Sequence, residues 1–135
     1  MPDSDGQITS DHGFDLSQDF EKLRDIVSAI KPFCGRISCF VDQGVQSLSL
    51  LQEIGAQRIE IYTGPYAEAY AHGAADHALS LCARTAMEAQ ALGIGVNAGH
   101  DLDQKNLFAF LKAVPKVQEV SIGHALFNDA LYDGL

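Results

Sequence analysis

The chain has 135 residues, of which 47% are hydrophobic and 20% charged, a composition typical of one globular domain with its own core. Its formal net charge of −9 argues against non-specific binding to nucleic acid or to an anionic membrane, because both need a basic surface. No apolar stretch approaches the roughly 20 residues of a membrane span, no signal-peptide pattern is present, and three cysteines without CxxC spacing indicate a reducing, cytoplasmic setting.

Helical and strand patterns alternate along the chain. Apolar residues at helical spacing predict helices over 20–30, 45–54, 78–92, 107–114 and 125–132. Short runs rich in β-branched residues predict strands over 36–41, 58–62, 93–97 and 119–122. This alternation is typical of an α/β protein, in which crossover helices join four parallel strands.

Two architectures fit this order of elements, an open doubly wound sheet and part of a (β/α)8 barrel. Four strands are too few for a closed barrel, which takes about 200 residues or more. The chain opens with a loop over 1–13 and stops about two or three turns into its last predicted helix. We therefore expect residues 1–135 to form a partial domain that is cut at both ends.

Polar and glycine residues gather where the predicted strands end. They are Asp42 after the first strand, Glu60 in the second, Asn97 to Asp101 at the third, and Gly123-His124 at the fourth. Ligands of parallel α/β sheets bind beyond the carboxyl ends of the strands. The sequence therefore predicts one site at this edge of the sheet.

Glu60 lies between Ile59 and Ile61, so strand alternation points its side chain to the opposite face from both neighbours. In a barrel that face is the lumen, where a carboxylate is costly unless it is paired or near the mouth. The pattern leaves two interpretations open, a functional carboxylate and a structural ion pair, for example with Arg58.

His100 follows Gly99 at a strand-to-helix turn, and an imidazole there suits proton transfer at neutral pH. The alternative is a loop histidine that caps a helix or hydrogen-bonds a carbonyl. For Asp101, capping of the helix expected to start near Asp103 is the simpler interpretation.

Gly123 and His124 end the last strand and begin the last helical segment. Glycine lets a phosphate approach the backbone, and a helix N-terminus offers N–H donors and the positive end of its dipole. The alternative is a tight turn that needs a positive φ. The pattern favours a phosphate site at this turn.

The other histidines, His12, His72 and His77, are expected to be solvated. The sequence contains no HExxH, Cys/His cluster, Walker loop or GxGxxG. It therefore predicts neither a metal site nor a nucleotide cofactor.

Three stretches closely resemble pyridoxine 5′-phosphate synthases: VDQGVQSLSLLQEIGAQRIEIYTGPYAEAY, LGIGVNAGHDLDQKNLFAFL and VQEVSIGHALFNDALYDGL. The opening PDSDGQITSDHGFDL is similar to the segment after the family's fourth barrel strand. The resemblance covers the whole chain and implies strands five to eight of a (β/α)8 barrel. It also implies an octamer that needs no cofactor and condenses 1-deoxy-D-xylulose 5-phosphate with 3-amino-2-oxopropyl phosphate to pyridoxine 5′-phosphate, phosphate and water.

The resemblance also implies residue roles. His100 matches the family's proton donor, and Glu60 matches a glutamate that stabilises charged intermediates. Gly123 and His124 match the pair that holds the phosphate of the aminoketone. Asp101 stands where the family contacts that substrate through its backbone, and Thr9 matches a threonine that contacts the deoxyxylulose phosphate.

The family's first four strands, which carry further catalytic residues and phosphate-binding arginines, have no counterpart here. We therefore expect this chain to be inactive alone and to self-associate through exposed sheet edges. Two alternatives stay open: a non-catalytic phosphate-binding half-barrel fragment, and a small flavodoxin-like α/β binding module.

Overall fold

A computed structural model describes residues 1–134 of the chain. Its sheet has four parallel strands, in the spatial order β1 (Ser38–Asp42), β2 (Arg58–Tyr62), β3 (Gly95–Gly99) and β4 (Val117–Ser121). The helices are α1 (Phe20–Ile30), the 3-10 turn η1 (Lys31–Phe33), α2 (Ser49–Ile54), α3 (Gly64–Ala71), α4 (Asp76–Ala91), α5 (Leu107–Ala113) and α6 (His124–Asp133). The predicted α/β fold of four parallel strands alternating with helices is confirmed.

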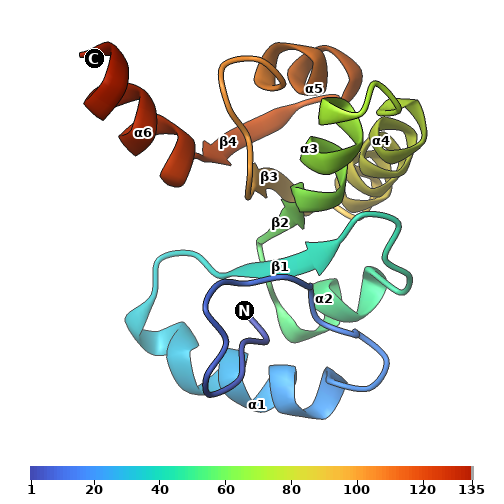
Figure 1. Ribbon diagram of the computed structural model, residues 1–135. Coiled ribbons are helices and arrows are strands. Elements are labelled where there is room, and N and C mark those ends of the chain that lie inside the picture. Colours follow the sequence, from blue (N-terminus) through green and yellow to red (C-terminus); the bar gives the residue numbers. More distant parts are fainter. Residues whose placement is uncertain (135) are drawn as a thin grey trace.

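The strand order separates the two architectures that the sequence left open. In a doubly wound sheet the order reverses at a switch point, where the ligand binds. Here each strand pairs with the next one in the chain, from β1 to β4, without a reversal (Figure 1). Sequential parallel pairing is the arrangement of a (β/α) barrel and excludes a flavodoxin-like sheet.

One helix was missed by the sequence analysis. Two helices, α3 and α4, connect β2 to β3, where a single helix was predicted. The residues of α3 are GPYAEAYA, and its alanines form no strong apolar stripe. Pro65 in the first turn, a favoured position for proline, was the available signal.

Several element boundaries differ from the prediction, and two of these differences have a reason in backbone geometry. The second helix begins at Ser49 rather than at 45, because Gly44 and Ser47 adopt φ values of 77° and 64°, outside the helical region. The third strand begins at Gly95 rather than at 93, because Gly93 turns the chain after α4 with a φ of 76°.

The core lies between the sheet and the helices on one of its faces. Ile59 and Ile61 of β2 and Val96 and Ala98 of β3 are fully buried there, as strand alternation requires. Small residues of α4, among them Cys82, let that helix pack closely on the strands. Burial of each large aliphatic side chain contributes about 1.5–3 kcal/mol.

The opposite face of the sheet carries a polar row that runs across three strands. Arg58 Nη1 donates to Asn97 Oδ1 at 3.0 Å, and Asn97 Nδ2 donates to Glu119 Oε2 at 3.1 Å. Arg36, two residues before β1, forms an ion pair with Glu119 at 2.7 Å. In a closed barrel this face is the lumen, so these residues form one polar layer within it.

The last helix is separate from the others. α6 projects from the end of β4, away from the group formed by α3, α4 and α5 (Figure 1). It has no buried residue, and Leu126, Phe127 and Leu131 are exposed on it. Within residues 1–134, no helix is long and apolar enough to cross a membrane.

Candidate functional site at the carboxyl ends of the strands

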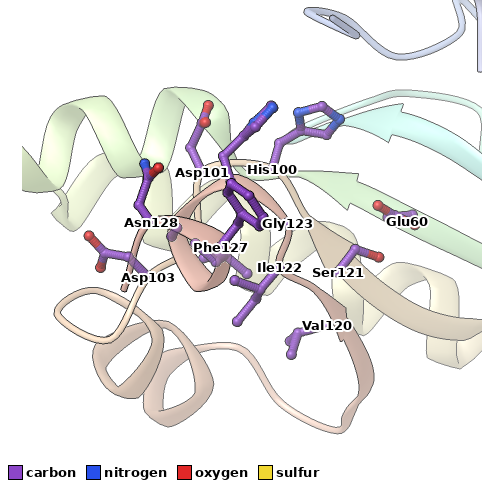
Figure 2. Close-up of a pocket in the computed structure, with 13 residues that line it drawn as sticks. Glu60, His100, Asp101, Asp103, Val120, Ser121, Ile122, Gly123, Phe127 and Asn128 are labelled. Carbon is purple, nitrogen blue, oxygen red and sulfur yellow. The ribbon is translucent and has the colours of Figure 1, made fainter. Parts of the chain in front are cut away.

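Five of the six predicted site residues surround one cavity of about 830 Å³ at the carboxyl ends of β2, β3 and β4 (Figure 2). The residues lining it are Glu60, His100, Asp101, Leu102, Asp103, Val120, Ser121, Ile122, Gly123, His124, Ala125, Phe127 and Asn128. Thr9 is not one of them. It is exposed in the N-terminal segment, where its carbonyl accepts a hydrogen bond from Gln7.

His100 stands directly after β3 in an uncommon backbone conformation. Its φ is 80° and that of Asp101 is 57°, so two consecutive non-glycine residues are left-handed. The imidazole packs at 5.3 Å from the ring of Phe40 and at 5.5 Å from that of Tyr62. These two aromatic rings pack against the imidazole, and His100 also lines the cavity.

Phe40 and Tyr62 were not identified from the sequence. They lie on the same face of the sheet as Glu60, and Phe40 pairs with Glu60 in register. The available signal was the two-residue spacing of Glu60 and Tyr62, which places them on one face. Burial, and then the nearby carboxylates led by Asp101, raise the pKa of Tyr62, which keeps its phenol neutral.

Glu60 makes no ion pair with Arg58, because the Arg58 guanidinium donates to Asn97 instead. Its carboxylate lies against the backbone of β3 at Gly99. A Cβ atom at Gly99 would stand 2.2 Å from Glu60 Oε1. Glycine at position 99 therefore makes the space that this carboxylate occupies beside the cavity.

The expected capping role of Asp101 is wrong. The helix α5 begins at Leu107, as its apolar spacing predicts and not near Asp103 as the capping interpretation required, and its N-cap residue is Asn106. Asp103 Oδ1 accepts hydrogen bonds from the backbone N–H groups of Lys105 and Asn106, at 2.8 Å each. Asp101 takes part only through its carbonyl, which accepts from Asn106 Nδ2, so its carboxylate is left exposed at the cavity.

Gly123 is not a turn glycine. Its φ of −111° lies outside the left-handed region, and a Cβ atom built there would meet nothing within 4 Å. Crowding within residues 1–134 therefore does not require glycine at this position. His124, the first residue of α6, is exposed beside it, and the first N–H groups of a helix lack partners within that helix.

The cavity is lined by acidic groups and histidines. Glu60, Asp101 and Asp103 are its carboxylates, and His100 and His124 are its only basic side chains among the described residues. No Lys or Arg of residues 1–134 lines it. A phosphate here would be held by backbone N–H groups and imidazoles rather than by strong cations.

Parallel strands in sequential order, with ionisable side chains gathered at their carboxyl ends, are the features of the (β/α)-barrel class of proteins. The family described as "Pyridoxal phosphate biosynthesis protein PdxJ" matches residues 1–135, so the chain belongs to this family. The resemblance found in the sequence is thereby confirmed.

Curated relatives agree with this assignment. The chain is 56% identical over 135 residues to "Pyridoxine 5'-phosphate synthase" of Xanthomonas axonopodis pv. citri (strain 306), covering 100% of the chain and 53% of the relative. It is 54% identical to the protein of that name from Xylella fastidiosa (strain M12), again over 100% of the chain but 52% of the relative. The chain thus spans about half the length of the curated relatives it matches.

Proposed function

We propose that residues 1–135 supply strands five to eight of the barrel of a pyridoxine 5′-phosphate synthase. The reaction would condense 1-deoxy-D-xylulose 5-phosphate with 3-amino-2-oxopropyl phosphate to pyridoxine 5′-phosphate, phosphate and water. The observation that carries this proposal is the convergence of Glu60, His100, Gly123 and His124 on one cavity, together with similarity to relatives named for this activity.

In this proposal His100 is the proton donor. The reaction loses water and phosphate, and each departure needs a proton on the leaving oxygen. The contacts with Phe40 and Tyr62 fix the imidazole beside the cavity before substrate arrives. Glu60 supplies a negative charge that stabilises the cationic intermediates formed by an amine and a ketone.

The turn at Gly123 and His124 would hold the phosphate of the aminoketone. The open space at Gly123 supports this role, because a Cβ atom built there would meet nothing within 4 Å. A bare backbone allows a phosphate oxygen to reach the first N–H groups of α6. His124 adds a donor from the first position of that helix.

The remaining assignments concern Thr9, Asp101 and the assembly. Asp101 would contact the aminoketone through its backbone, and Thr9 would contact the deoxyxylulose phosphate once the rest of the barrel surrounds the N-terminal segment. The proposed enzyme uses no metal or organic cofactor and works in the cytoplasm as a homo-oligomer, an octamer by family resemblance. The buried thiols of Cys39 and Cys82 suit a reducing compartment.

The chain alone would be inactive. Its cavity has no Lys or Arg lining among the described residues, and two phosphorylated substrates need more positive charge than two histidines supply. The missing cations would come from the part of the barrel that the relatives have in addition. Without them the substrates would not be held in reacting geometry.

The proposal is tested by mixing the purified chain with the remaining part of the Xanthomonas axonopodis relative and measuring pyridoxine 5′-phosphate formation. His100→Asn should lower turnover by at least about 100-fold, the range of general acid catalysis. His77→Asn is the matched control, because His77 is exposed on α4 away from the cavity. Equal turnover in both variants would remove His100 from the chemistry.

A further inference from the structure

The side chain of Thr63 makes an unusual set of contacts beside the site. Thr63 directly follows β2 and is fully buried. Its hydroxyl lies 2.6 Å from the carbonyl oxygen of Gly99 and 2.5 Å from that of His100. Its backbone N–H also donates to the Gly99 carbonyl, at 2.9 Å.

These contacts are not those expected at this position. Thr63 is the N-cap residue of α3, where a threonine hydroxyl usually accepts a hydrogen bond from the backbone of its own helix. No such capping bond forms here. A hydroxyl has one proton and both carbonyls are acceptors, so Thr63 shares its proton between Gly99 and His100.

The carbonyls that Thr63 holds belong to the turn carrying His100. His100 and Asp101 are both left-handed, with φ values of 80° and 57°. Non-glycine residues adopt positive φ uncommonly, although Asn, Asp and His do so more often than the others, and two such residues in succession need support from their surroundings. The Thr63 hydroxyl is the buried group that fixes its first two carbonyls.

We propose that Thr63 is a positioning residue. Its hydroxyl proton, shared by two carbonyls, holds the Gly99–His100 turn. The turn in this conformation keeps the His100 imidazole packed against Phe40 and Tyr62 and beside the cavity. The consequence for turnover rests on the proposed function, whereas the orientation of His100 does not. Thr63 itself does not line the cavity, so it acts through His100.

The test uses Thr63→Val, which removes the donor and keeps a branched side chain, and Thr63→Ser, which keeps the donor. Thr85→Val is the matched control. Thr85 is also buried, and its hydroxyl donates to the Leu81 carbonyl and accepts from the Gly44 N–H, so its hydrogen bonds do not involve the His100 turn. NMR of histidine-labelled chain reports the His100 ring protons, identified by their loss in His100→Asn. The neighbouring aromatic rings displace them from the signals of the exposed histidines.

We expect Thr63→Val to move the His100 signals toward those of the exposed histidines, while Thr63→Ser and Thr85→Val leave them in place. In the mixture with the remaining part of the relative, kcat for Thr63→Val should fall about 100-fold, the cost of a small misplacement of a catalytic group, with a much smaller change in KM. If Thr63→Val does not fold, the same measurements are made on Thr63→Ala, with the same expected results.

Unchanged His100 signals in Thr63→Val would overturn the positioning role. Displaced signals with unchanged kcat would overturn its importance for the reaction. Absence of turnover in the wild-type mixture would instead count against the proposed function, and the imidazole signals would still decide whether Thr63 positions His100.

Discussion

Gly99 lies against the Glu60 carboxylate and Gly123 lines the cavity, and the two glycines differ in what a side chain at each would meet. At Gly99 a side chain would collide with the Glu60 carboxylate inside the chain. At Gly123 a side chain built on the backbone would meet nothing within 4 Å among the described residues. A bound phosphate is the occupant that our proposal supplies for that space.

Substitution by alanine separates the two cases. Gly99→Ala should lower the free energy of unfolding by about 1–2 kcal/mol, because Glu60 must move to admit the methyl group. Gly123→Ala should change it by less than about 0.5 kcal/mol and instead weaken the binding of inorganic phosphate. Urea unfolding and phosphorus NMR titration measure the two effects. Phosphate binding unaffected by Gly123→Ala would contradict the role of this turn.

The left-handed conformation of Asp101 affects the stability of the chain. Its left-handed φ of 57° costs an aspartate about 1 kcal/mol relative to glycine, and its carboxylate makes no capping bond in return. Asp101→Gly should therefore leave the thermal midpoint unchanged or raise it. A lowered midpoint would mean that the carboxylate makes a stabilising contact after all.

Among the secondary-structure elements, α3 contacts the segment before α5 through the side chain of Tyr66. This side chain is fully buried, its ring packs 5.3 Å from that of Phe110, and its hydroxyl donates to the Asn106 carbonyl at 2.7 Å. Burial, followed by the nearby Tyr70, raises the pKa of Tyr66 to about 12. The contacts of Tyr66 thus connect the helix after Glu60 to the loop after His100.

Tyr66→Phe should cost about 1 kcal/mol at neutral pH, because the Asn106 carbonyl loses its buried donor. The raised pKa also has a pH consequence. The unfolded chain loses this proton near pH 10 and the folded chain near pH 12, so the stabilisation is complete below pH 10 and declines toward pH 12. Urea unfolding at several pH values should show a smaller difference between wild type and Tyr66→Phe at high pH. A constant difference would contradict this.

Elements were predictable from the sequence to the extent that their signals are local. Alternation around Ile59 and Ile61 identified β2, and the helical stripe that ends at Gly55 identified α2. The cavity was identified because ligands of parallel sheets bind beyond the carboxyl ends of the strands. The helix α3 escaped because its apolar residues are mostly alanine. Thr63 escaped because its partners stand 36 and 37 residues away, a distance that no local pattern reports.

At the scale of the whole molecule, the chain exposes surfaces that a complete barrel would cover. Leu126, Phe127 and Leu131 of α6 are each at least 56% exposed, and the outer edges of β1 and β4 have no strand partner among the described residues. Such apolar and edge surfaces drive association in water. We expect light scattering to show oligomers of the purified chain, and Leu131→Glu to shift them toward monomer. A monodisperse monomer would contradict this expectation.

In our proposal the site is divided between this chain and the rest of the barrel. The most direct measurement is pyridoxine 5′-phosphate formation from the two phosphorylated substrates, by the chain alone and by its mixture with the remaining part of the Xanthomonas axonopodis relative. We expect no turnover by the chain alone and turnover in the mixture. Turnover by the chain alone would show that copies of residues 1–135 rebuild a complete site, and would contradict the account.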